Sequence, residues 1–166
     1  MDKAEVMRQL AERLNQPRVA EALGETAGEL LVELRDDPTQ PKSTFRVISL
    51  DLYGVLPTDI RSAWLFALRK GFAHPPERHP NSIQRMFALK QSGRFEVWNG
   101  REWVTNTLHP NDSGLSIPID TWHRSPALDD DWVVASFHTA EPDELVEIVG
   151  DPTRGEAGSS RISLAT

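Results

Sequence analysis

The segment between residues 71 and 93 constrains the fold of this chain more than any other stretch. Three prolines between residues 75 and 80 disfavour a helix there, because proline lacks a backbone donor and forces the preceding residue toward an extended conformation. In an extended chain, side chains two positions apart point to the same face, so Glu77 and His79 should lie side by side. The apolar run from Ile83 to Leu89 follows at once. The segment therefore predicts an extended polar stretch that leads into a strand.

A second segment, from Pro118 to His123, ends in another histidine. If strand pairing brings His123 beside Glu77 and His79, the three side chains form a small polar cluster inside an apolar barrel. Two imidazoles and one carboxylate are the donor set of many non-haem iron sites. The two segments together therefore indicate a candidate metal site, with a hydrogen-bonded polar pocket without metal as the alternative.

The first segment resembles the first sequence motif of the cupin family. That motif has a glycine, five residues, His-x-His, a glutamate after three or four more residues, and then a glycine turn. Here Gly71 is followed by five residues and then by Glu77-Arg78-His79. Gln84 stands where the glutamate is expected, and Gly93 closes the turn two residues late.

The second segment resembles the second cupin motif, Pro-x-Gly-x-x-His. The spacing from Pro118 to His123 matches, and Asp120 replaces the glycine. Aspartate tolerates left-handed backbone conformations better than most residues, so we expect it to form the same turn. The resemblance covers roughly residues 44–150. It implies an all-β fold, the cupin-type double-stranded β-helix, which is a jelly-roll barrel built from two sheets.

The resemblance also implies a set of metal ligands, namely Glu77, His79, Gln84 and His123. This set differs from the three histidines and one glutamate of the family. The formal ligand charge stays at one negative, because Glu77 supplies a carboxylate and Gln84 only a neutral amide oxygen. The metal would be a divalent ion such as iron, manganese, nickel or zinc. His74 is an alternative ligand, but its odd spacing from Glu77 favours a loop position at the barrel mouth.

Three readings remain open at this point. The first, implied by the resemblance, is a metal-dependent oxygenase or isomerase acting on a small polar molecule, with His79 and His123 as the main ligands. In either class, the metal polarises an enol or carbonyl oxygen, or binds oxygen, in a water-poor cavity. The second is a metal-free module that binds a small ligand in a degenerate metal site, and a purely structural cupin is a third reading. We expect the ligand to contact Trp64, Met86 and His138.

The region after the N-terminal helices has many short strands with frequent turns, which is typical of a β-sandwich or barrel. Asn99-Gly100 is a strong signal for a two-residue hairpin. We expect the runs 83–89, 95–98 and 102–108 to form an antiparallel meander, with a turn at Ser92-Gly93. The other expected strands begin at Thr44 and span Ile60–Lys70, Leu115–Ile117, Trp122–Arg124 and Trp132–His138.

Residues 1–36 have the pattern of two amphipathic helices, the second starting at Pro17. Their polar faces carry more acids than bases, the opposite of what a DNA-reading helix pair needs. We expect them to pack on the outside of the sheet, with a lid or a dimer contact as the alternative. The run from Glu141 to Val149 begins like a short helix. The predicted organisation is a helical segment at 1–37, a barrel at 42–150 and a flexible tail at 151–166.

Composition excludes several classes of partner. A net charge of −7 and a sequence pI of about 5.2 argue against binding to nucleic acid or to an anionic membrane. The chain has no cysteine, so disulfides and thiolate metal sites are excluded. No apolar run approaches the roughly 18 residues of a membrane span, and the first residues lack an apolar signal core. We therefore expect a cytoplasmic protein and, because cupins commonly pair through their sheets, a homodimer that binds a small molecule.

Overall fold

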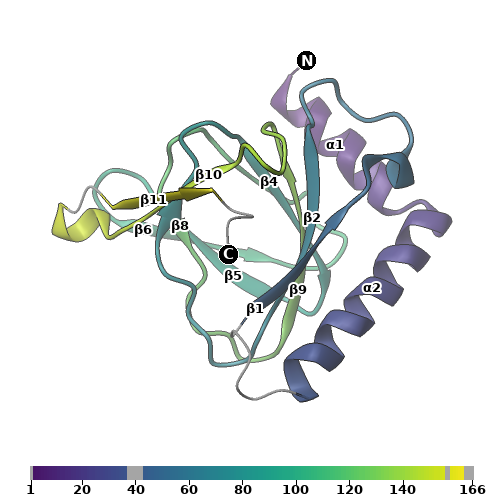
Figure 1. Cartoon of the computed structure of the whole chain (residues 1–166), viewed down its shortest axis with the longest axis horizontal. Coiled ribbons are helices and arrows are strands. Elements are labelled where there is room, and N and C mark those ends of the chain that lie inside the picture. Colours follow the sequence, from purple (N-terminus) through teal and green to yellow (C-terminus); the bar gives the residue numbers. More distant parts are fainter. Residues whose placement is uncertain (1, 37–42, 156–157, 163–166) are drawn as a thin grey trace.

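The computed structural model describes residues 2–36, 43–155 and 158–162, which form two antiparallel β-sheets and two helices (Figure 1). The predicted class, a jelly-roll barrel with an N-terminal helical segment, is confirmed. The first sheet has the order β1 (Ser43–Ile48), β2 (Ser62–Leu68), β9 (Trp132–His138), β4 (Gln84–Lys90) and β7 (Leu115–Ile117). The second has the order β11 (Ser159–Ile162), β10 (Val146–Val149), β3 (Glu77–Arg78), β8 (His123–Arg124), β5 (Gly93–Trp98) and β6 (Trp103–Leu108). The helices are α1 (Lys3–Leu14) and α2 (Pro17–Asp36), with short 3₁₀ turns η1 (Leu50–Tyr53) and η2 (Pro152–Arg154).

Both predicted helices are present, and α2 begins at Pro17. Leu10, Leu23 and Leu30 are buried where the helices pack against the five-stranded sheet. The helices therefore cover the outer face of that sheet, along one side of the barrel (Figure 1). Neither of these helices combines the length and the apolar character that a bilayer crossing requires.

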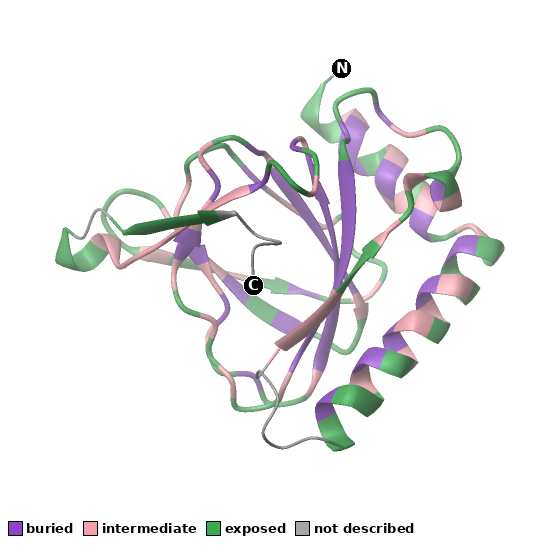
Figure 2. Cartoon of the chain, in the orientation of Figure 1, coloured by how far each residue is buried: buried purple, intermediate pink, exposed green. Residues whose placement is uncertain are grey.

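β9 is buried on both faces because it lies between the barrel interior and the helices (Figure 2). Alternate residues of a strand point to opposite faces. Val133, Ala135 and Phe137 share one hydrophobic core with the helices, whereas Trp132 and Val134 belong to a second core inside the barrel. Cover on both faces explains why most of this strand reads as a continuous apolar run.

β4 does not form a meander with β5 and β6, so that prediction is wrong. β5 and β6 do form the expected hairpin, although residues 99–102 join the strands and the predicted two-residue connection is too short. β4 lies in the other sheet, between β9 and β7. Phe87 packs toward the helices and Met86 toward the barrel interior, so β4 needs cover on both sides. A local turn signal shows that the chain reverses, and it does not show which sheet the next strand joins.

Residues 141–149 form a turn followed by β10, so the predicted short helix is wrong. The side chain of Asn81 explains the difference, because its Nδ2 donates to the Glu144 carbonyl at 2.7 Å and its Oδ1 accepts from the Val146 N–H at 3.1 Å. These bonds from a distant segment hold the turn and help to align β10 with β3. The tail predicted to be flexible over 151–166 contains β11, which pairs with β10. Part of that tail lies outside the described residues.

Two turns show where backbone conformation constrains the sequence. Asp120 has a φ of 60°, so the residue that replaces the cupin glycine adopts the left-handed conformation as predicted. Between β4 and β5, the left-handed residue is Gln91, with a φ of 61°, and Gly93 instead begins β5. Gly93 has a different reason to be glycine, because a Cβ at this position would overlap the ring of Trp132.

Gly93→Ala should lower the free energy of unfolding by about 1–3 kcal/mol or more, since the added methyl group overpacks a buried tryptophan. The matched control is Gly28→Ala on α2, where a Cβ meets nothing within 4 Å. That change should raise the free energy of unfolding by about 0.5–1 kcal/mol, because alanine is the better helix former. Urea denaturation measures both effects, and an unchanged stability of Gly93→Ala would contradict the close packing against Trp132.

Candidate metal centre

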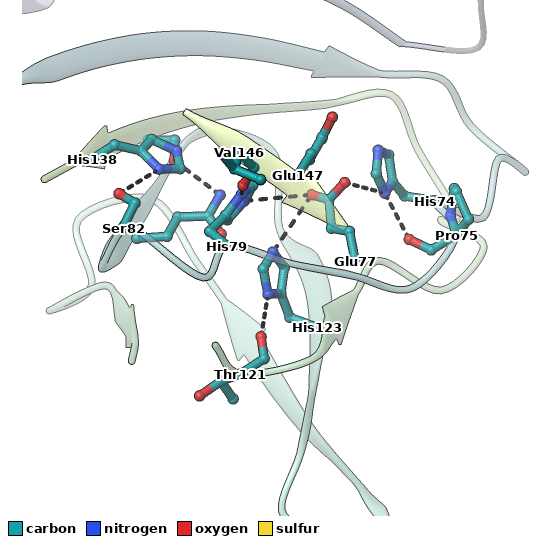
Figure 3. Close-up of polar contacts among 12 residues, drawn as sticks. His74, Pro75, Glu77, His79, Ser82, Thr121, His123, His138, Val146 and Glu147 are labelled. Atoms are coloured by element: carbon teal, nitrogen blue, oxygen red, sulfur yellow. Dashed lines mark hydrogen bonds and ion pairs between the residues drawn. The ribbon is translucent and has the colours of Figure 1, made fainter. Parts of the chain in front are cut away.

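The pairing of β3 with β8 brings together Glu77, His79 and His123, which we call the Glu-His-His cluster (Figure 3). Glu77 lies directly opposite His123 in this pairing, and His79 follows β3 at once. The three residues are only 8%, 4% and 1% exposed. Oε1 of Glu77 is 3.9 Å from Nε2 of His79 and 3.5 Å from Nε2 of His123. One ligand atom from each residue lies within 4.8 Å of the others, close enough to bind a single metal ion.

Backbone carbonyls fix the orientation of both imidazoles. Nδ1 of His79 is 3.1 Å from the Val146 carbonyl oxygen, and Nδ1 of His123 is 2.8 Å from that of Thr121. A carbonyl oxygen only accepts hydrogen bonds, so Nδ1 carries the hydrogen in both rings. In a neutral ring Nε2 then bears the lone pair, and in both rings it faces Glu77. Histidines that bind metals usually have this arrangement, in which the other ring nitrogen donates to a carbonyl or carboxylate.

Several buried polar atoms here have no hydrogen-bond partner among the described residues. They include Nε2 of His79, Nε2 of His123 and Oε1 of Gln84. Buried polar atoms are normally bonded, and leaving one unpaired costs about 1–3 kcal/mol. A divalent metal ion would bond to the two imidazole nitrogens and to the carboxylate between them. The donor set therefore fits a metal ion of the kind that the cupin resemblance implies.

Burial and neighbouring charges set the protonation states of the cluster. Burial by itself raises the pKa of the Glu77 carboxyl, but His74, His123 and His79 hold that pKa well below its usual range. Burial lowers the pKa of His79 to about 4. At neutral pH Glu77 is therefore ionised and His79 is neutral, which are the states that bind a metal ion.

Glu147 on β10 is a site residue that the sequence analysis missed. Its carboxyl lies beside that of Glu77 (Figure 3), and burial together with the Glu77 charge raises the pKa of Glu147 to about 8. Two adjacent buried carboxyls cannot both ionise without strong repulsion, so at neutral pH the proton stays on Glu147. Arg161 on β11 donates a hydrogen bond to Glu147 at 2.7 Å and opposes this rise in pKa. The sequence analysis predicted a helix for this segment, so it gave no indication of the sheet face to which Glu147 belongs.

Gln84 and His74 reach the same cavity from different parts of the fold. Gln84, at the start of β4, comes from the opposite sheet to the Glu-His-His cluster, and its Nε2 donates to Oγ of Ser136 at 3.1 Å. His74 lies in the loop before β3, with Nδ1 3.8 Å from Oε2 of Glu77 and 3.0 Å from the Pro75 carbonyl oxygen. The position of His74 agrees with the predicted loop placement. Its ring nitrogens are not among the ligand atoms of Glu77, His79 and His123 that lie within 4.8 Å of one another.

A cavity of about 400 Å³ extends from the cluster toward β1 and β2. Trp64, Met86 and His138, the three residues predicted to contact a ligand, all line it. Their contact with a ligand stays a prediction. The ring of Trp64 lies 5.5 Å from that of Phe45 and 6.0 Å from that of Phe66. The cavity therefore has an aromatic wall and, at the cluster, a polar end.

Solved structures with a similar fold include cocosin and an 11S globulin. Cocosin, a coconut allergen, is 18% identical with a TM-score of 0.53, over 68% of this chain and 30% of its own. An 11S globulin from Wrightia tinctoria, described as revealing an auxin binding site, is 16% identical with a TM-score of 0.53, over 70% of this chain and 29% of its own. Both are cupin proteins. This chain has the cupin fold.

At these identities the cupin likeness concerns the fold and no more. An oxalate oxidase in complex with glycolate is 13% identical with a TM-score of 0.49, over 63% of this chain and 54% of its own. This chain thus spans about half of the oxidase and less than a third of each globulin. No family model and no curated protein matches the sequence. The function of this chain therefore has to be argued from its site.

Glu147→Gln should remove a pH dependence of stability from the metal-free protein. The folded-state pKa of Glu147 is about 8, above its ordinary value of 4.5, so the unfolded chain loses this proton first. Wild-type protein therefore loses stability as the pH rises from about 4.5 to about 8, and the glutamine variant lacks that loss. Urea denaturation at several pH values across the interval should show the variant gaining stability relative to wild type. The control is Glu102→Gln, at an exposed position on the β5–β6 hairpin; equal pH profiles for Glu147→Gln and wild type would contradict the assignment.

Proposed function

We propose that this cupin is a metal-dependent enzyme, an oxygenase or isomerase that acts on a small molecule with a polar end inside the barrel. The observation that carries the proposal is the pair of unpartnered imidazole nitrogens that face a buried, ionised carboxylate. In this proposal His79 and His123 are the main ligands, Glu77 is the anionic ligand and Gln84 adds an amide oxygen. Iron, manganese, nickel and zinc all suit two imidazoles and a carboxylate.

A divalent ion held by these residues supplies a Lewis acid that polarises an enol or carbonyl oxygen, or a redox partner for dioxygen. The chain itself supplies the preorganisation. The Val146 and Thr121 carbonyls keep a hydrogen on each Nδ1, so the two Nε2 atoms stay available as donors. The low pKa of Glu77 keeps a negative charge at the centre of the cluster, where it offsets part of the charge of the ion.

The cavity walls favour a substrate with a flat apolar part and one oxygen-bearing end. Trp64 and Phe66 stack with their ring planes 13° apart and present an aromatic surface. Leu68, Met86 and Val134 add apolar surface to the cavity wall. A substrate whose apolar part contacts these residues would direct its oxygen-bearing end to the Glu-His-His cluster, the polar end of the cavity.

A metal-free ligand-binding module is the second candidate, and the pairing of Glu77 with Glu147 favours it. A protonated Glu147 can donate a hydrogen bond to the Glu77 carboxylate, which partly offsets the cost of burying that charge without any ion. Gln84 in place of a second carboxylate fits such a pocket, because an amide binds metal ions weakly and hydrogen-bonds well. The two candidates differ in whether the purified protein holds metal.

Protein purified without a histidine tag should contain a divalent metal, and His79→Ala or His123→Ala should abolish it at neutral pH. Each change removes one of the two imidazole ligands, and elemental analysis measures the result. His109→Ala is the matched control, because His109 is an exposed histidine just after β6 and should not affect the metal content. The metal should also be lost as the pH falls toward about 4, the pKa of His79, since its ligands must be deprotonated.

Two outcomes would count against this assignment. Stoichiometric metal in a His79→Ala and His123→Ala double variant would show that these histidines are not the ligands. A wild-type protein that neither contains metal nor takes up Fe²⁺, Mn²⁺, Ni²⁺ or Zn²⁺ would favour the metal-free module.

A further inference from the structure

A buried network of Ser82, His138 and Ser136 leads to the side chain of Gln84. The three residues are 1%, 1% and 0% exposed. The network ends where Nε2 of Gln84 donates to Oγ of Ser136 at 3.1 Å. None of the three belongs to the Glu-His-His cluster, but the direction of their hydrogen bonds decides which end of the Gln84 amide remains free.

The direction is set at Ser82. Its single hydroxyl hydrogen goes to the Ile83 carbonyl at 3.1 Å, while its Oγ accepts from the Thr139 N–H at 3.0 Å. With that hydrogen used, Oγ of Ser82 can only accept from Nδ1 of His138, at 3.3 Å. In a neutral His138 ring the one hydrogen is therefore on Nδ1.

Ser136 connects His138 to Gln84, and the His138 tautomer sets the direction of both hydrogen bonds of Ser136. Nε2 of His138 bears a lone pair, so it accepts from the hydroxyl of Ser136 at 3.0 Å. The Ser136 oxygen has then given its hydrogen away and can only accept, which it does from Nε2 of Gln84. Turning the amide over would place two oxygens together with no hydrogen between them. Oε1 of Gln84 is therefore left buried and unpartnered among the described residues.

We propose that Ser82, His138 and Ser136 are positioning residues that hold the Gln84 amide with Oε1 free as a neutral oxygen donor to a divalent metal ion at the Glu-His-His cluster. The last step rests on the proposed function, whereas the network itself requires no metal. Gln84 pairs with His138 across β4 and β9, and the His138 ring lies 5.1 Å from that of His79. Gln84, His138 and His79 also line one cavity.

The network also accounts for an amide at position 84, where the cupin motif has a carboxylate. An ionised carboxylate has no hydrogen to offer Ser136, whose own hydrogen is given to His138. A glutamate at this position would therefore face an oxygen without a hydrogen between them, or force the whole chain of hydrogen bonds to reverse. The site thus selects a neutral oxygen donor and leaves Glu77 as its ionised carboxylate.

The first experiment uses the metal-free, full-length protein. Long-range ¹H–¹⁵N correlation spectra distinguish the two neutral tautomers of histidine, and a His138→Asn variant assigns the His138 signals. We expect the hydrogen on Nδ1, and we expect Ser136→Ala to shift the Nε2 resonance of His138. A hydrogen on Nε2 would overturn the proposal whatever the protein binds.

The second experiment is a double-mutant cycle with Co²⁺ as the probe, followed by visible absorption. Ser136→Ala should weaken Co²⁺ binding about 10-fold, the lower end of what the loss of a ligand-orienting residue costs. In a Gln84→Met background, the same change should have no further effect, because Ser136 acts through Gln84. Equal weakening in both backgrounds would overturn the positioning role.

The matched control for the cycle is Ser62→Ala, at another buried serine. Its hydroxyl donates to the Ala140 carbonyl at 2.8 Å and accepts from Nε1 of Trp64 at 3.0 Å, and neither partner belongs to the network that ends at Gln84. This variant should be less stable than wild type but bind Co²⁺ equally well. If wild-type protein binds no Co²⁺, the proposed function fails, and the tautomer of His138 still decides whether the network is oriented as inferred.

Discussion

A buried carboxylate is the constraint on which the rest of this site depends. The side chain of Glu77 is 10% exposed, and moving an ionised carboxylate out of water costs on the order of several kcal/mol unless partners compensate. The protonated Glu147 beside it offsets part of this cost. The Nε2 lone pairs of His123 and His79, 3.5 and 3.9 Å from the carboxylate, would offset it by binding a cation together with Glu77. These partners come from the segments at β3, β8 and β10. The Glu-His-His cluster and Glu147 therefore depend on the assembled six-stranded sheet, and no single segment contains them.

β10 is a short strand, but two successive residues of it contact the Glu-His-His cluster. The carbonyl of Val146 holds the His79 ring, and the next residue, Glu147, places its carboxyl beside Glu77. One residue thus contributes its backbone and the next its side chain, so both depend on the register between β10 and β3. A slip of one residue would turn Glu147 to the opposite face of the sheet. The bonds from Asn81 to the turn before β10 oppose such a slip.

The parts of the site that were predictable from sequence are those set by local geometry. Glu77 and His79 share a face because they are two residues apart in an extended chain, and the spacing of the second motif marked His123. Glu147 was not predictable, because the segment around it has the composition of a helix start and becomes a strand only through bonds to a distant residue. The role of Ser136 was equally hidden, since a lone serine in an apolar run gains meaning only when β4 and β9 pair. Local signals therefore located the residues of the Glu-His-His cluster, whereas tertiary contacts decided what surrounds them.

β9 connects the helical layer to the site. Its alternate residues point in opposite directions, so Ala135 and Phe137 pack against the helices while Ser136 and His138 face the cavity network. Protein interiors are close-packed, so the packing on one face fixes the position of the side chains on the other. Among the described residues, none of those lining the cavity belongs to α1 or α2. The helices are thus linked to the cavity network through the strand that they cover, with Ala135 and Phe137 on one face of β9 and Ser136 and His138 on the other.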